Sequence, residues 1–324
     1  MPIIQNSAYP GSPFFLFNGH LQTVYPSIFR QVKEVNYRRQ RLILSDGDFV
    51  DLDWLDTDSR KLVVLSHGLE GDSYRHYIKG TAKLFAKNGW DVLAWNCRSC
   101  SGEMNKAFRL YNHGEIGDIA EVINYALDQK KYESVVLVGY SMGGNISLKY
   151  LAVNAPNLHR VIRGGVAFSA PTNLQTSAAL LDLPQNRLYK QRFLQKLTLK
   201  IRAKNEQYPD ILDLTKLQQI KVWKDFDNFF SAPINGYRDA DDFYAQGSAV
   251  RYLPSITVPV LICNAQNDPI LNEDCAPVAL AESHPLIYVE TPATGGHVGF
   301  LLPNDPFTWA ERRALEFVEK VILA

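Results

Sequence analysis

The sequence predicts an α/β fold in which a mostly parallel central sheet is flanked by helices and carries an inserted helical lid. Short apolar segments alternate with helical segments from Leu62 onward, which is typical of parallel strands joined by crossover helices. The alternation stops between about residues 171 and 249, where no strand pattern occurs. One strand pattern, Val135–Val138, leads into a glycine-rich turn and then into a helical pattern.

Composition limits the possible classes of protein. The chain has 324 residues, of which 46% are hydrophobic, enough for one large domain with an insertion or for two domains. Its 34 basic and 34 acidic residues cancel, so nothing indicates a nucleic-acid partner. No apolar run approaches the roughly 18 residues of a membrane span, and the N-terminus does not resemble a secretory signal. Only four cysteines occur, which favours a reducing compartment, and we expect a cytoplasmic location.

We expect two structural parts. Residues 1–171 and 246–324 form the core domain, which includes an N-terminal arm at residues 1–30, and residues 172–245 form the lid. The insertion leaves the sheet just after the carboxyl end of a strand, where active sites of such sheets lie, so we expect it to cover the site. The alternative is a peripheral helical extension with no part in function.

The expected strands begin with an antiparallel pair, Tyr37–Leu44 and Phe49–Leu55, which Asp46-Gly47 joins in a turn. The strands expected to run parallel are Leu62–Ser66, Asp91–Trp95, Val135–Val138, Gly165–Ser169, Pro259–Cys263 and Leu286–Glu290. Helices are expected near Tyr77–Lys87, Ile116–Gln129, Asn145–Val153 and Phe307–Ile322.

Within the insertion, Leu188–Lys204 is expected to form an amphipathic helix. One face is apolar and the other is basic, carrying Arg192, Lys196 and Lys200. A solvated basic face is the simpler expectation, and transient contact with anionic head groups at a membrane surface is the alternative. The aromatic stretch from Trp223 to Phe230 is expected to be irregular.

The turn Gly139-Tyr140-Ser141-Met142-Gly143 matches the pattern Gly-x-Ser-x-Gly between a strand and a helix. Glycines are needed there because a Cβ at either position would collide with the neighbouring strand or helix. Ser141 would then lie at the apex with strained backbone angles, beside the unpaired first amides of a helix that favour negative charge. Ser141 is therefore a candidate nucleophile; the alternative is an ordinary serine in a glycine-rich turn.

A serine nucleophile needs a general base and an acid that orients the base. In this architecture the chain order is serine, acid, histidine, and only His284 and His297 follow every plausible acid. His284 enters the last strand at the wrong end, whereas His297 follows it in a glycine-flanked loop, so His297 is the predicted base. Asp268, just after the strand Pro259–Cys263, is the predicted acid.

Two backbone amides are expected to form an oxyanion hole, those of Met142 and Leu69. Leu69 lies in the glycine-rich loop after the strand Leu62–Ser66, and His67 is expected to be structural there. Cys97 and Cys100 have a C-x-x-C spacing but no second close pair, so we expect reduced cysteines rather than a metal or redox site. No metal or organic cofactor is expected.

These residues together resemble the α/β-hydrolase fold. More narrowly, several segments resemble the bacterial YheT-like hydrolases, which are grouped with eukaryotic ABHD-type proteins. The segments are Asn18–Thr23, Ser99–Glu103, Tyr111–Glu115, Phe226-Asp227, Ala232–Tyr237 and Gly295–Phe300. The resemblance implies a serine esterase or lipase that acts on acyl esters with the triad Ser141, Asp268 and His297. For residues 18–23 we expect a structural role that ties the arm to the edge of the sheet.

The predicted function is hydrolysis of a carboxylic ester, either a short-chain ester or an acylglycerol-type lipid, through an acyl-enzyme on Ser141. The expected partner is therefore a small acyl ester. Thioesterase, peptidase and cofactor-free haloperoxidase activities stay open because the same triad serves them. A non-catalytic lipid-binding or interaction protein that keeps the fold is the alternative from another class.

Overall fold

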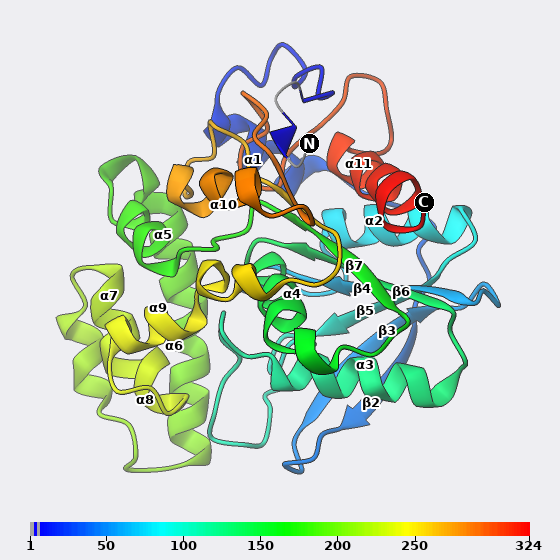
Figure 1. Ribbon diagram of the computed structural model, residues 1–324. Helices are drawn as coiled ribbons and strands as arrows, with labels where there is room; N and C mark the ends of the chain where they lie inside the picture. The colour runs from blue at the N-terminus through cyan, green and yellow to red at the C-terminus, as the bar shows by residue number, and fades with distance from the viewer. Residues whose placement is uncertain (1–2, 5–6) are drawn as a thin grey trace.

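The computed structural model describes residues 3–4 and 7–324. In this part of the chain the backbone forms a nine-stranded sheet with helices on both faces (Figure 1). Along the sheet the strands follow the order β1-β9-β8-β7-β6-β4-β5-β3-β2. Their bounds are β1 Ile3–Ile4, β2 Arg38–Ile43, β3 Phe49–Leu55, β4 Lys61–Ser66, β5 Asp91–Asn96, β6 Ser134–Tyr140, β7 Ile162–Phe168, β8 Val260–Cys263 and β9 Ile287–Glu290.

The sheet is mostly parallel, as the alternation of strand and helix patterns predicts. β2 pairs with β3, and β3 with β5, in antiparallel fashion, whereas every other neighbouring pair is parallel. The carboxyl ends of β4, β6, β7, β8 and β9 therefore meet at one edge, and the loops that follow them are brought together.

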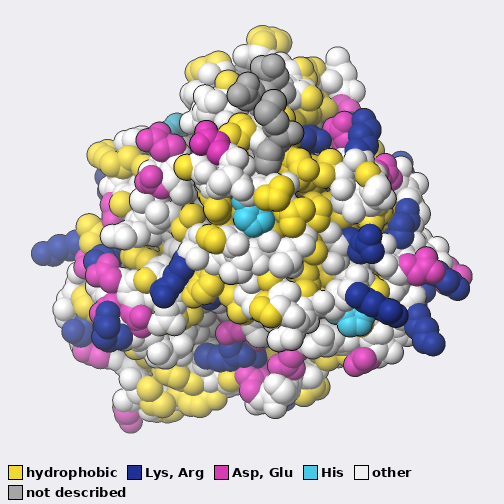
Figure 2. Space-filling view, in the orientation of Figure 1, with side chains coloured by type: hydrophobic (Ala, Val, Ile, Leu, Met, Phe, Trp, Pro, Cys, Tyr) yellow, Lys and Arg dark blue, Asp and Glu magenta, His cyan; other side chains and the backbone are white. Residues whose placement is uncertain are grey.

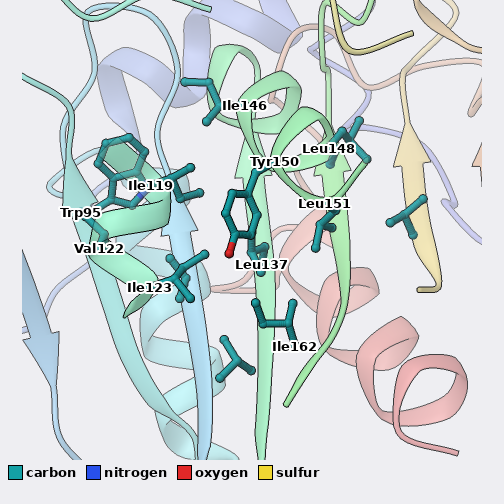
Figure 3. Packing of buried hydrophobic residues seen from close by; sticks show 14 of the residues in the cluster. Trp95, Ile119, Val122, Ile123, Leu137, Ile146, Leu148, Tyr150, Leu151 and Ile162 are labelled. Carbon is teal, nitrogen blue, oxygen red and sulfur yellow. The ribbon is translucent and has the colours of Figure 1, made fainter. Parts of the chain in front are cut away.

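Two apolar cores lie on opposite faces of the sheet. The branched residues of β6 alternate, so Val135 and Leu137 belong to one core and Val136 and Val138 to the other. The first core is covered by α3 (Gly117–Gln129), α4 (Met142–Val153) and α10 (Val278–Ser283), and Figure 3 shows side chains of α3 and α4 packed on the sheet. The second is covered by α2 (His76–Lys87) and α11 (Trp309–Phe317).

Five α-helices lie between β7 and β8 in sequence and form a separate group beside the sheet, at the left of Figure 1. They are α5 (Leu174–Leu181), α6 (Arg187–Gln207), α7 (Trp223–Phe226), α8 (Ala232–Ile234) and α9 (Ala240–Gly247). They bury apolar clusters of their own, one around Trp223 and Phe243 and one around Phe226 and Phe230. The segment is thus held together by its own apolar contacts as well as by contacts to the core.

Several observed elements differ from the predicted ones. Residues 3–4 of the arm form β1 beside β9, and residues 19–29 form the helix α1 (Gly19–Phe29). β7 begins at Ile162, three residues before the predicted start, which was placed late because Gly164 and Gly165 interrupt the apolar pattern. A Cβ on Gly165 would lie 2.8 Å from the Leu151 Cδ1, so α4 packs closely on the strand at this glycine. The stretch predicted as irregular forms α7 and a π-helix at Asp227–Ser231, and the last predicted helix continues from α11 as a π-helix, Val318–Ile322.

The basic face of α6 is turned partly toward the core rather than toward solvent. Lys200 forms an ion pair with Glu70, its Nζ 2.7 Å from Oε1, and the Lys196 Nζ donates to the Glu70 carbonyl oxygen at 3.2 Å. The Lys204 side chain is fully buried and donates to the carbonyl oxygens of Asn105 and Ala107. The expectation of a solvated face is therefore wrong for these lysines, because loops of the core supply their partners.

Candidate active site

Ser141 stands at the sharp turn between β6 and α4. Its backbone angles, φ 53° and ψ −124°, are strained for a residue with a side chain, as predicted. A Cβ on Gly139 would lie 2.3 Å from the carbonyl oxygen of Gly143, and one on Gly143 would lie 2.2 Å from that of Ser66. Both glycines are thus required by close approach of the backbone.

His297 and Asp268 lie beside Ser141, brought there by the loops after β9 and β8. The His297 Nε2 is 2.9 Å from the Ser141 Oγ, and the His297 Nδ1 is 2.8 Å from the Asp268 Oδ2. The three predicted side chains, which are far apart in sequence, therefore form one continuous hydrogen-bonded chain. The Asp268 carboxylate accepts a hydrogen bond from the Nδ1–H group, which keeps the proton of the neutral imidazole on Nδ1. The unprotonated Nε2 is then free to accept a proton from the serine.

The orientation of the Asp268 carboxylate is fixed by backbone amides. Its Oδ1 accepts hydrogen bonds from the N–H groups of Ile270, at 2.9 Å, and Leu271, at 3.2 Å. Because these donors occupy Oδ1, Oδ2 is the oxygen that faces the imidazole. The side chain is fully buried, so water does not compete for these contacts.

The loop that carries His297 has a strongly bent backbone. Gly295 and Gly296 have φ values of 147° and 60°, and Val298, a β-branched residue, has φ 61°. The Val298 N–H donates to the Ser169 Oγ at 2.9 Å, which ties the loop to the end of β7. The glycines bend the loop toward Ser141, as their position in the sequence predicts.

Helix α1 holds both catalytic loops, which agrees with the structural role expected for residues 18–23, although the sequence did not indicate which groups they contact. The Oε1 of Gln22, a buried residue, accepts from the Gly295 N–H at 2.8 Å and from the Asn267 Nδ2 at 2.9 Å. The Thr23 Oγ1 accepts from the His297 N–H at 2.8 Å. A Cβ on Gly19 would lie 1.9 Å from the Asn267 carbonyl oxygen, so α1 packs directly on the loop of the acid. The signal in the sequence was the resemblance of residues 18–23 to a segment of the YheT-like hydrolases.

The amides expected to form an oxyanion hole are both available. Neither the Leu69 N–H nor the Met142 N–H donates to another group in the part of the chain that the structure describes. Met142 is the first residue of α4, where an N–H has no partner inside its own helix. Leu69 precedes Glu70, whose φ of 54° lies in the left-handed region. The backbone therefore turns sharply directly after Leu69.

His67 is fully engaged by backbone contacts in the same turn. Its Nε2 accepts from the Cys97 N–H at 3.0 Å, so its Nδ1 carries the proton and donates to the Gly68 carbonyl oxygen at 2.8 Å. Burial lowers the pKa of this imidazole to about 4. His67 is therefore a neutral histidine of the loop, consistent with the structural role predicted for it.

Two cavities open on either side of Ser141. The first has an empty volume of about 520 Å³, including space open to solvent, and is lined mainly by apolar residues of the inserted helices, among them Leu174, Ala178 and Phe243. The second, of about 840 Å³ on the same measure, is lined by Thr23, Val24 and Ser27 of α1 and by Arg75 and Arg192. Both contain Ser141 and His297 in their walls, so the two cavities meet at the hydroxyl.

The cysteines take no part in this site. All four are free, and Cys97, Cys263 and Cys275 are buried. Across residues 3–4 and 7–324, no three His, Cys, Asp or Glu side chains are grouped so that they could hold a metal ion. In those same ranges no helix combines the length and the hydropathy that crossing a bilayer requires.

Comparison with known proteins identifies the family. A family model described as the alpha/beta hydrolase fold matches residues 61–303. YheT of Escherichia coli (strain K12) is 34% identical over 305 residues, which cover 91% of this chain and 88% of YheT. The chain belongs to the α/β hydrolase fold family. Its resemblance to the YheT-like hydrolases, drawn above from short motifs, is thereby confirmed.

This α/β hydrolase is also similar to two relatives named for lipid hydrolysis. Phospholipase ABHD3 of Mus musculus is 26% identical, over 99% of this chain and 80% of its own length. Monoacylglycerol lipase of Saccharomyces cerevisiae (strain ATCC 204508 / S288c) is 24% identical, over 94% of this chain and 79% of its own. The chain is accordingly an ester-cleaving enzyme of this family.

Solved structures show the same fold. The esterase Pf2001 of Pyrococcus furiosus superposes with a TM-score of 0.61 at 19% identity, covering 91% of this chain and 96% of that one. An esterase from Exiguobacterium antarcticum, EaEST, gives a TM-score of 0.52 at 18% identity, covering 89% and 100%. At these identities the likeness concerns the fold alone, and it confirms the predicted parallel sheet with flanking helices.

Proposed function

We propose that this α/β hydrolase cleaves carboxylic esters through a covalent acyl-enzyme on Ser141. The observation that carries the proposal is the hydrogen-bonded chain from the Ser141 Oγ through the His297 ring to the Asp268 carboxylate. A serine hydroxyl is a weak nucleophile, and an imidazole within hydrogen-bond reach can remove its proton as the oxygen attacks. Asp268 would hold the imidazole in the required tautomer and stabilise the imidazolium.

The reaction then follows from the groups around Ser141. Attack of Oγ on the ester carbonyl carbon forms a tetrahedral oxyanion, which the Leu69 and Met142 amides would bind. His297 gives its proton to the alcohol oxygen as the carbon–oxygen bond breaks, leaving the acyl group on Ser141. Water, deprotonated by His297, attacks that acyl carbonyl and releases the acid and the free serine. Losing one oxyanion donor is expected to raise the barrier by ~3 kcal/mol.

The two cavities differ in a way that supports an assignment of the two halves of the substrate. The first is lined by aliphatic and aromatic side chains of α5, α7 and α9, which suits an apolar acyl chain. The second has two guanidinium groups in its wall, and no Asp or Glu among its described lining residues, which suits an alcohol that carries negative charge. Residues 172–245 would thus serve as the lid over the acyl group.

The relatives support the same substrate class. One is named a phospholipase and another a monoacylglycerol lipase, so we propose an acyl ester of a glycerol-based lipid as the natural substrate. A short-chain ester would be a simpler substrate of the same reaction. A cytoplasmic location remains a prediction.

A panel of p-nitrophenyl esters of increasing chain length tests the proposal. We expect turnover of the butyrate by the wild type and none by Ser141→Ala. Ala178→Leu, which narrows the first cavity, should shift the preferred chain length downward while leaving acetate hydrolysis within about twofold. Equal rates for wild type and Ser141→Ala would refute the proposal. Thioester and anilide analogues with matched acyl groups distinguish thioesterase and peptidase activity.

Labelling with a fluorophosphonate separates the proposal from the non-catalytic alternative. The probe reacts covalently with an activated serine, so the wild type should be labelled and Ser141→Ala should not. A folded wild-type protein that resists the probe would favour a binding protein that only keeps the fold.

A further inference from the structure

The N-terminal arm and α1 expose an unusual number of large hydrophobic side chains. We call the exposed set the arm surface. Phe14 is 94% exposed, Phe17 79% and Phe29 63%. The arm surface consists of Phe14, Phe15, Phe17, Val24, Ile28 and Phe29. Large exposed apolar patches on soluble domains usually mark a contact with another molecule or with a lipid surface.

Ring contacts show that much of this surface is continuous. The ring of Phe15 lies 5.8 Å from that of Phe14 and 5.3 Å from that of Tyr25, which in turn lies 5.0 Å from that of Phe29. Val24 and Ile28 are one helical turn apart on α1, so they share a face. In Figure 2 hydrophobic side chains gather at the top of the molecule, where Figure 1 places the loops of the arm.

The arm surface borders the second cavity. Val24 belongs to both, and its neighbours Thr23 and Ser27 also line the cavity that leads to Ser141. Across the cavity lies α6, whose Tyr189 hydroxyl is 3.1 Å from the His20 Nδ1 of α1. The preceding residue, Leu188, is 78% exposed and extends the apolar surface onto α6.

The two chain segments that form and border this surface contain no acidic residue. No Asp or Glu occurs among residues 1–33 or among residues 183–205 of the sequence. The lysines of α6 are engaged, Lys190 with Asp182 and Lys200 with Glu70. Arg187 and Arg192 are exposed, and neither forms an ion pair within residues 3–4 and 7–324. An apolar surface bordered by unpaired guanidinium groups complements an anionic lipid surface, which offers acyl chains beneath negative head groups.

We propose that the arm surface docks this enzyme on anionic lipid bilayers, with its aromatic and aliphatic side chains in the interface and Arg187 on the head groups. Docking in this orientation places the mouth of the second cavity at the bilayer, so an ester can pass from the lipid to Ser141. The sequence offered the basic face of residues 188–204 in the lid as an alternative membrane contact. We place the contact on the arm instead, because Lys196 and Lys200 both bind Glu70. Lys204 is buried and donates to carbonyl oxygens of the core, so none of these three lysines is free to contact a membrane.

Cosedimentation with vesicles tests the proposal on the full chain. The wild type should bind vesicles that contain phosphatidylglycerol in phosphatidylcholine, and binding should weaken with salt. The triple variant Phe14→Ser, Phe17→Ser, Ile28→Ser should bind at least tenfold more weakly, and Arg187→Glu should bind more weakly to anionic vesicles only. None of these residues lines either cavity, so turnover of water-soluble p-nitrophenyl butyrate should stay within twofold. Ile43→Ser and Ile211→Ser, at exposed positions elsewhere on the surface, serve as matched controls.

Three results would overturn the proposal: no binding of the wild type to anionic vesicles, equal binding by the triple variant, or a wild-type dimer in solution that the triple variant abolishes. The last would make a second copy of the chain the occupant of the arm surface. Measuring vesicle binding on Ser141→Ala as well separates docking from hydrolysis, because failure of the proposed catalysis leaves that measurement unchanged.

Discussion

The hydroxyl oxygen of Thr23 lies 2.8 Å from the backbone nitrogen of His297 and accepts its N–H. The same hydroxyl donates to the Gly19 carbonyl oxygen at 2.6 Å, so a side chain of α1 links the first turn of that helix to the loop of the proposed base. Gln22, the preceding residue, holds Gly295 and Asn267. The arm is therefore part of the frame that positions His297 and Asp268.

Replacing Thr23 by valine keeps the shape of the side chain but removes the acceptor. The His297 N–H is left unpaired, which typically costs ~1–3 kcal/mol, and the loop can relax away from Ser141. We expect kcat for p-nitrophenyl butyrate to fall by about tenfold or more, with a smaller change in KM. Thr23→Ser, which retains the hydroxyl, should stay near the wild type. Identical kinetics for the two variants would show that this hydrogen bond does not position His297.

Asp268→Asn tests the role of the carboxylate. The Ile270 and Leu271 amides hold an oxygen at the Oδ1 position, so the asparagine would turn its NH₂ toward His297. The imidazole would then carry its proton on Nε2 and could not accept one from Ser141. By analogy with other serine hydrolases, kcat should fall by roughly 10⁴-fold, with the fold intact by circular dichroism. A loss of less than tenfold would contradict this role.

Lys200→Met tests whether α6 positions the oxyanion loop. Lys200 is the cationic partner of Glu70, whose N–H and carboxylate also contact the Tyr111 hydroxyl. Without that partner, the loop that carries the Leu69 amide is expected to shift, so kcat should fall by about tenfold with little change in KM.

A matched control lies on the same helix. Lys190→Met breaks an ion pair of similar length, with Asp182, that does not touch the oxyanion loop. It should leave kcat within twofold. Adding Glu70→Gln to Lys200→Met removes the unpaired charge and should recover part of the loss. Equal losses for Lys190→Met and Lys200→Met would indicate a general effect on the inserted helices instead.

Asp227→Asn is expected to change how stability depends on pH. Burial raises the pKa of Asp227 from 3.8 to about 6 in the folded protein, where the Tyr244 hydroxyl donates to its Oδ2 at 2.7 Å. The folded state therefore holds the proton more tightly than the unfolded state, and stability contributed by this group is lost as pH rises from about 4 to about 6. The loss is on the order of 3 kcal/mol at neutral pH.

Urea unfolding at several pH values measures the effect. Asparagine cannot ionise, so the stability of Asp227→Asn relative to the wild type should increase between pH 4 and pH 7. Burial lowers the pKa values of His67 and His113 to about 4, so these two histidines have the opposite effect. Their contribution to the stability of the folded protein is lost as the pH falls from 6.5 toward 4. Their contribution is the same in both proteins and cancels in the difference. A difference that does not vary with pH would contradict the raised pKa.

Much of the fold was predictable because its signals are local. The strand Val135–Val138 and the turn at Ser141 carry their own apolar run and required glycines, and both occur as expected. β1 was missed because two isoleucines make no periodic pattern, and their pairing partner, β9, lies far away in sequence. The π-helix at Asp227–Ser231 was missed because it depends on packing around Phe226 and Phe230, which its own sequence does not reveal.

The amino-acid sequence by itself was enough to predict the main strands and crossover helices and to choose Ser141, Asp268 and His297. The glycine spacing around Ser141 is a local signal, and the positions of the acid and the base follow from their order along the chain. Only the tertiary structure decided that Thr23 and Gln22 fix the catalytic loops, that Lys200 is turned toward Glu70, and that the arm leaves its aromatic side chains exposed. These features depend on which residues, distant in the chain, come into contact and on which side chains stay uncovered. A pattern of neighbouring residues in the sequence does not determine either.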